Sequence, residues 1–210
     1  MTKFVVAVDG PAGSGKSSVC KEAARRLGFG YLDTGAGYRA MAIQVQRSGS
    51  LDAALSKFQY EISLDPNIEK VSLAGLDITT EIRSSEVAEQ VRVVAKDQRV
   101  RELQRHDARE RIDICSQPGI IVEGRDITTV VAPNAQVRIL LTASEAVRLS
   151  RRAKDQTEEA ANLLARDSSD STVAEFMTPA EGVKLIDTTD LDFEKSVQAV
   201  ISEIEAVRSV

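Results

Sequence analysis

The sequence has few of the residues that carry nucleophilic, redox and metal chemistry. Its 210 residues include two cysteines and one histidine. Cys20 and Cys115 are too few and too widely spaced for a disulfide framework or a zinc site, and His106 has no second histidine with which to share catalysis. No apolar run approaches the roughly 18 residues that cross a bilayer. These absences exclude disulfide-rich secreted proteins, zinc proteins and helical membrane proteins.

The charge balance makes broad attraction to polyanions unfavourable. The net charge is −5, so we expect neither nucleic acid nor a membrane as a partner. The first residues also lack the apolar segment and cleavage site of a signal peptide, because Asp9 and the glycines after it interrupt the only apolar run there. We therefore expect a cytoplasmic protein. The arginines are unevenly spread, which leaves room for a local basic cleft.

Apolar periodicity predicts alternating strands and helices. Such alternation is typical of an α/β protein with a doubly wound parallel sheet. The runs at 58–64 and 69–75, separated by the turn signal "DPN", do not fit the alternation and predict a hairpin in a small inserted lobe. The predicted core strands are residues 3–8, 29–33, 119–122, 137–142 and 183–187. The predicted helices are 16–27, 36–47, 84–96, 98–114, 144–166 and 193–208.

A glycine-rich loop follows the first predicted strand. Residues 10–17, "GPAGSGKS", match G-x-x-x-x-G-K-[ST] and lie between a buried strand and a helix, which is the context that this motif requires. Glycine lets successive backbone N–H groups turn towards one phosphate, and the following helix adds its N-terminal dipole. The motif predicts a nucleoside triphosphate site in which Lys16 reaches the phosphates and Ser17 holds Mg²⁺.

Charged residues at two other strand ends predict a second pocket. Asp33 and Thr34 follow one strand, and Glu123, Arg125 and Asp126 follow another, where α/β folds bind ligands. Each charge taken alone is explained equally well as a surface salt bridge or a helix cap. Glu123 is placed to orient Mg²⁺ or its waters. The arginines that could hold a second polyanion are Arg39, Arg83, Arg99, Arg101, Arg125, Arg151, Arg152 and Arg166. Together with the loop, and without the aspartate–glycine and N-K-x-D segments of a GTPase, these residues favour a P-loop kinase for a small acceptor.

Four stretches carry a resemblance to one family. They are "DGPAGSGKSSVCKEAARRLGFGYLDTGAGYRA", "EIRSSEV", "VEGRDITTVVAPNAQVRILLTAS" and "RDSSDS". In them the chain resembles the bacterial cytidylate kinases of the nucleoside monophosphate kinase group, most strongly over 4–40 and 118–152. The resemblance implies phosphorylation of CMP and dCMP to CDP and dCDP by ATP, in pyrimidine nucleotide metabolism.

The resemblance also implies a domain organisation. It implies one kinase domain over 1–210, with a P-loop kinase core of residues 1–57 and 98–210. An inserted lobe for the nucleoside monophosphate would occupy about 58–97, and a helical lid about 148–172, where Arg148, Arg151 and Arg152 would lie. Such a lid closes over ATP and excludes water. The family precedent is a monomer.

Individual roles follow from the same resemblance. Arg39 would bind the phosphate of the acceptor, and Asp170 its sugar. The residues implied for ATP are Gly10, Pro11, Ala12, Gly13, Ser14, Gly15, Lys16, Ser17 and Ser18, with Mg²⁺ at Ser17. Those implied for CMP are Thr34, Arg39, Arg101, Arg125, Asp126 and Asp170. Lys16, Arg151 and Arg166 would be catalytic. No covalent intermediate is needed, because positioning and charge stabilisation do most of the work in phosphoryl transfer.

Two positions depart from the family pattern. Arg92 occupies the place of a serine that helps to read the base, and Val173 that of an arginine that contacts the acceptor. We expect Arg92 to bind a carbonyl or to replace the charge missing at Val173. Two other readings stay open: a related P-loop kinase for UMP or another small acceptor, and an ATP-binding regulator without turnover.

Overall fold

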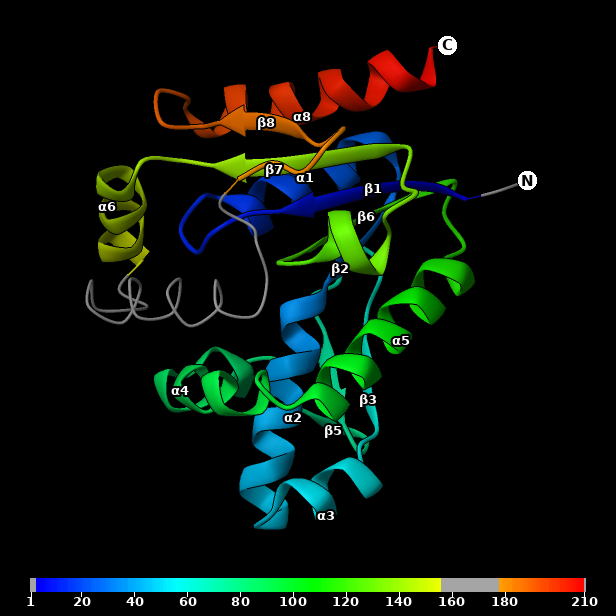
Figure 1. The fold of residues 1–210 in the computed structure, drawn as a ribbon, viewed down its shortest axis with the longest axis vertical. Coiled ribbons are helices and arrows are strands. Elements are labelled where there is room, and N and C mark those ends of the chain that lie inside the picture. The colour runs from blue at the N-terminus through cyan, green and yellow to red at the C-terminus, as the bar shows by residue number, and fades with distance from the viewer. Residues whose placement is uncertain (1–2, 156–177, 210) are drawn as a thin grey trace.

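The protein is built on a parallel sheet with helices on both faces (Figure 1). The computed structural model describes residues 3–155 and 178–209. Within them the main sheet has the strand order β2-β6-β1-β7-β8, and every neighbouring pair is parallel. The strands are β1 (Phe4–Asp9), β2 (Gly30–Asp33), β6 (Gly119–Gly124), β7 (Val137–Thr142) and β8 (Lys184–Asp187). This confirms the predicted doubly wound sheet.

Both faces of the sheet are buried, as the continuous apolar runs of its strands require. Successive side chains of β1 point to opposite faces, so Val6 and Val8 lie in one core and Ala7 in another. The first core is covered by α1 (Lys16–Leu27) and α8 (Phe193–Arg208). The second is covered by α5 (Gln98–Ile114) and a short π-helical segment, η2 (Ile127–Val131).

A lobe with its own apolar core extends away from the sheet. In Figure 1 the helix α2 (Thr34–Ser48) runs down from the sheet into this lobe. The lobe also contains α3 (Leu51–Ser56), the 3₁₀ turn η1 (Glu81–Arg83) and α4 (Ser85–Val94). Its antiparallel sheet consists of β3 (Tyr60–Ile62), β4 (Val71–Leu73) and β5 (Leu76–Asp77). The β3–β4 pair confirms the predicted hairpin, whereas α3 and β5 were not predicted.

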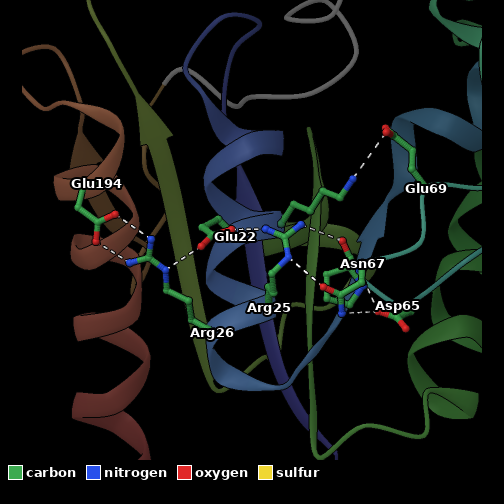
Figure 2. A network of polar contacts seen from close by, with 9 residues as sticks. Glu22, Arg25, Arg26, Asp65, Asn67, Glu69 and Glu194 are labelled. Atoms are coloured by element: carbon green, nitrogen blue, oxygen red, sulfur yellow. Dashed lines mark hydrogen bonds and ion pairs between the residues drawn. The ribbon is translucent and has the colours of Figure 1, made fainter.

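Polar contacts also join the lobe to α1, the helix that follows the glycine-rich loop (Figure 2). Arg25 Nε of α1 donates a hydrogen bond of 3.0 Å to Asn67 Oδ1 in the turn between β3 and β4. On the other side of α1, Arg26 pairs with Glu194 of α8. The lobe and the core therefore also meet at the C-terminal end of α1, the end opposite the glycine-rich loop.

The helical region after β7 is only partly described. The predicted helix over 144–166 corresponds to α6 (Glu145–Asp155), and its continuation lies outside the described residues. No helix within 3–155 and 178–209 is long and apolar enough to cross a membrane.

Candidate active site

One large cleft brings together most of the residues implied for the site. Its volume is about 1470 Å³, and it runs between the glycine-rich loop, the ends of β2 and β6, and the lobe. The implied residues that line it are Pro11, Ala12, Gly13, Ser14, Gly15, Lys16, Ser17, Ser18, Thr34, Arg39, Arg101, Arg125, Asp126 and Arg151. Gly10 begins the loop without lining the cleft. Arg166, Asp170 and Val173 lie outside the described residues.

The loop after β1 needs glycine at two positions for different reasons. A Cβ at Gly10 would collide with the carbonyl oxygen of Leu141 on β7. Gly15 has a φ of 88°, a left-handed conformation that side chains with a Cβ adopt at a cost. The first glycine allows the loop to pass close to the sheet, and the second turns the chain into α1.

Arginines from other segments bind the carbonyl groups of the loop. Each of three guanidinium groups donates a hydrogen bond to an alternate residue of the loop: Arg125 to Gly10, Arg148 to Ala12 at 3.0 Å, and Arg151 to Ser14 at 3.0 Å. The shape of the loop is therefore supported by contacts with the rest of the protein.

Two arginines expected at the substrates thus contact the loop backbone in this structure. Arg125 was implied for CMP, and Arg151 for catalysis. Arg151 donates further hydrogen bonds to the carbonyl and hydroxyl groups of Thr188, at 2.8 and 3.0 Å. Both arginines line the cleft, and their roles towards the substrates stay predictions.

Two of the helices that begin at the cleft, α1 and α2, lack a side-chain cap, whereas α4 and α8, whose first residues also line it, are capped. A Ser or Asp side chain caps the N-terminus of α3, α4, α5 and α8. No side chain caps α1 or α2, and neither has an acidic residue in its first turn. The free N–H groups and the positive end of the dipole at such a terminus attract anions. Two uncapped helix ends therefore face the cleft: the end at Gly15–Lys16 is suited to an anion, and at Asp33–Thr34 the Asp33 carboxylate is paired with Arg39.

Lys16 is paired with a buried carboxylate at the end of β6. Its Nζ lies 2.8 Å from Glu123 Oε2, and the side chain of Glu123 is 1% exposed. Tyr31 donates a hydrogen bond of 2.7 Å to the other oxygen. Burial alone would raise the pKa of Glu123, but the Lys16 ammonium, aided by the Ser17 and Tyr31 hydroxyls, holds that pKa below its ordinary value. Glu123 is thus an ionised counter-ion for the loop lysine.

A second buried carboxylate lies at the end of β1. Asp9 accepts hydrogen bonds from the backbone N–H groups of Ile127 and Thr128, both at 2.8 Å, and from the Thr128 hydroxyl at 2.6 Å. Burial raises the pKa of Asp9 above its ordinary value, because it outweighs these hydrogen bonds. Asp9 thereby joins the start of the glycine-rich loop to the segment after β6.

The other half of the cleft is built from ion pairs between side chains. Arg39 on α2 pairs with Asp33 at the end of β2. Its Nε is buried and has no hydrogen-bond partner among the described residues. Arg101 and Arg105, one turn apart on α5, both bind Asp126 Oδ2. A buried guanidinium N–H without an acceptor favours an anionic ligand at this point.

Three residues of this arrangement were not among those implied for the site. Asp9 is the last residue of β1, and a charged residue at the end of a buried strand is the sequence pattern that indicates it. Arg105 follows Arg101 at the i+4 spacing that puts two side chains on one helix face. Tyr31 lies within a strand, and nothing in the sequence pattern distinguishes it from a core aromatic residue.

Similarity to solved structures identifies the fold. A gluconokinase from Sinorhizobium meliloti 1021 superposes with a TM-score of 0.56, covering 98% of this chain and 95% of that chain at 14% sequence identity. This likeness, the sheet order and the loop after β1 define the class: the fold is that of a P-loop kinase.

The sequence then places the chain in a family. The family model described as cytidylate kinase matches residues 6–206. The cytidylate kinase of Cutibacterium acnes is 40% identical over 212 residues, covering 94% of each chain. That of Rhodococcus opacus is 41% identical over 210 residues, covering 92% of this chain and 91% of the relative. The chain belongs to the cytidylate kinase family. Membership confirms the predicted class of enzyme, an ATP-dependent nucleotide kinase.

Proposed function

We propose that this cleft transfers a phosphoryl group from ATP to CMP or dCMP. The observation that carries the proposal is the pair of uncapped helix N-termini, α1 and α2, which open into one cleft beside Lys16 and Arg39. Phosphates of ATP and CMP bound at these two termini would lie side by side. Such proximity supplies much of the catalysis in phosphoryl transfer.

The loop half is proposed to bind ATP. The amides of residues 10–18 would surround its phosphates, and Lys16 would move from Glu123 to the transferring group. The Lys16 ammonium would move only a short way to reach the phosphate, because its partner Glu123 lines the same cleft. Arg151 and Arg166 are proposed to neutralise the charge that develops on the phosphoryl group.

The loop half also fits a magnesium ion. Ser17 is exposed in the cleft and hydrogen-bonded to Glu123, and hydroxyl and carboxylate oxygens suit Mg²⁺. Residues 3–155 and 178–209 contain no cluster of three acidic, histidine or cysteine side chains that could hold an ion alone. Ser17 and Glu123 would therefore hold the ion together with nucleotide phosphate and water. The ion would supply charge neutralisation between the phosphates.

The second half is proposed to bind CMP. Arg39 and the N-terminus of α2 would hold its phosphate, because the buried Arg39 Nε is without an acceptor among the described residues. Arg101, Arg125 and Asp126 would present donors and acceptors to the cytosine. Thr34 would lie at the cytosine end, and Asp170 would bind the sugar.

The arrangement of the chain around the cleft is part of the same proposal. We propose a core of 1–57 and 98–210, a lobe of about 58–97 for CMP, and a lid of about 148–172. The apolar core of the lobe also includes residues of α2, α3 and α5, so the lobe packs on helices outside 58–97. We further propose a cytoplasmic monomer acting on free nucleotides, in keeping with two free cysteines and a net charge of −5.

The test is an ADP-release assay with Mg-ATP and a panel of acceptors: CMP, dCMP, UMP, AMP, GMP and shikimate. The expected result is rapid turnover with CMP and dCMP and background rates with the others. The Lys16→Met variant, which removes the ammonium group and keeps a long side chain, sets that background. Preference for another acceptor would overturn the assignment of the base pocket, and ATP binding without any turnover would favour a regulator.

A separate variant tests whether Arg92 binds CMP, because Arg92 lines the cleft at a position where the family has a serine. If Arg92 compensates for Val173, Arg92→Ala should raise the KM for CMP about tenfold, as expected when a hydrogen bond to a charged group is lost. An unchanged KM would remove Arg92 from the site.

A further inference from the structure

The glycine-rich loop and the segment after β6 hold each other through two oppositely directed contacts. The side chain of Asp9, at the start of the loop, binds the backbone of Ile127 and Thr128. The side chain of Arg125, in the other segment, donates to the backbone carbonyl of Gly10. Each segment thus uses a side chain to hold the main chain of the other.

The strands bring these segments together. Asp9 and Gly124 are paired residues at the ends of the neighbouring parallel strands β1 and β6. One strand leads into the loop proposed for ATP, and the other into Arg125 and Asp126, proposed for CMP. Any shift between the two strand ends therefore changes the distance between the two substrates.

Burying the carboxylate of Asp9 carries a desolvation cost that folding alone does not require. Its side chain is 3% exposed, and it has no ion-pair partner within 3–155 and 178–209. A buried carboxylate without a cation is unfavourable even when its oxygens are hydrogen-bonded, and an apolar or amide side chain would fill the place with less desolvation. Three hydrogen bonds on one rigid side chain do, however, define the position of the segment that donates them.

We propose that Asp9 and Arg125 form a reciprocal clamp that sets the distance between donor and acceptor, which makes Asp9 a positioning residue for phosphoryl transfer. The proposal rests on the proposed function and deepens it. Reacting atoms must approach within roughly 3–3.5 Å, and misplacement by about 1 Å can cost on the order of 100-fold in rate. Loosening the clamp should therefore slow the chemical step while each nucleotide still binds to its own half.

Thr128 offers the cleanest way to loosen the clamp. Its hydroxyl donates the 2.6 Å hydrogen bond to Asp9 Oδ2, it is buried, and it does not line the cleft. Thr128→Val removes that hydrogen bond with almost no change in volume, and Thr128→Ser keeps the hydroxyl. Ile201→Val in α8 removes one methylene group from the core on the other face of the sheet and controls for lost stability.

The measurement is single-turnover phosphorylation of CMP, so that product release does not mask the chemical step, together with the KM for each substrate. We expect Thr128→Val to lower the single-turnover rate about tenfold, with both KM values within about twofold. Thr128→Ser should restore most of the rate, and Ile201→Val should leave it unchanged at a similar melting temperature. Should Thr128→Val not fold, Asp9→Asn takes its place with the same expected split.

Two outcomes would overturn the clamp. One is an unchanged rate in Thr128→Val and Asp9→Asn. The other is a loss that appears equally in Ile201→Val, which would reduce Asp9 to a stabilising residue. Both are distinguishable from failure of the proposed function, in which wild-type protein would not phosphorylate CMP at all.

Discussion

The two halves of the cleft are prepared for anions in different ways. Around the glycine-rich loop, arginines bind backbone carbonyls, and the buried Glu123 holds Lys16. In the acceptor half, charged side chains bind one another, as in the pair of Arg39 with Asp33. Contacts with the backbone fix the shape of a loop, whereas an ion pair between side chains can be exchanged for a ligand. Under the proposed function, the loop half would keep its shape when ATP binds, and the acceptor half would exchange its ion pairs for contacts with CMP.

The difference also separates what each carboxylate does. Asp9 is held by hydrogen-bond donors and burial raises its pKa, whereas Glu123 is paired with the Lys16 ammonium and its pKa is lowered. The first carboxylate holds main chain, and the second balances a charge that the nucleotide would otherwise balance. Removing the Glu123 carboxylate should therefore lower the free energy of unfolding most in the protein without nucleotide.

The largest expected effect concerns the loop half. Glu123→Gln leaves the Lys16 ammonium, 12% exposed, without its counter-ion, and we expect a loss of about 3 kcal/mol in the free energy of unfolding at pH 7. Chemical denaturation measures it. Glu22→Gln makes the same replacement at the surface of α1, where Glu22 pairs with Arg25 and Arg26, and should cost much less because solvent screens exposed ion pairs. Equal losses in the two variants would contradict the special place of Glu123.

The same variant has a defined pH dependence. Because the folded pKa of Glu123 lies below its ordinary value of 4.5, its stabilising contribution is present above that pH. The contribution is lost as the pH falls through the folded pKa. The difference between wild type and Glu123→Gln should thus stay constant from pH 8 to 6 and shrink below pH 4.5. A difference that shrinks between pH 8 and 6 would contradict the lowered pKa.

The next effect concerns the acceptor half. Arg39→Ala removes the guanidinium whose Nε lacks a partner among the described residues, so the KM for CMP should rise about 10- to 100-fold. The KM for ATP should change less than about threefold, because the loop is held by other contacts. Arg47→Ala on the same helix, where Arg47 pairs with Glu81, is the matched control and should change neither value. Equal rises in both KM values after Arg39→Ala would remove the distinction between the halves.

The smallest effect lies outside the cleft. Arg25→Ala breaks the contacts between α1 and the turn of the lobe drawn in Figure 2, and we expect under about 1 kcal/mol in the free energy of unfolding. The turnover rate should stay within about twofold. A loss above about 2 kcal/mol would mean that the position of the lobe depends on this surface network.

The sequence predicts local features of this molecule better than contacts between distant segments. The loop with Lys16 and Ser17, the core strands and the β3–β4 hairpin each have a pattern within one short stretch. The short elements α3 and β5 have too few residues for a period to emerge. Nothing in the sequence tells that Arg148 and Arg151 bind carbonyls of the loop, because a guanidinium near a carbonyl more than 130 positions away leaves no local pattern.

The most direct test of the account is whether both substrates occupy the cleft at once. Within the described residues, no histidine or cysteine lines the cleft, and His106 is 75% exposed on α5. Direct transfer from ATP to CMP requires a ternary complex. Initial rates with both substrates varied should give double-reciprocal lines that intersect. Parallel lines would indicate a phosphorylated enzyme and would contradict direct transfer between the two halves.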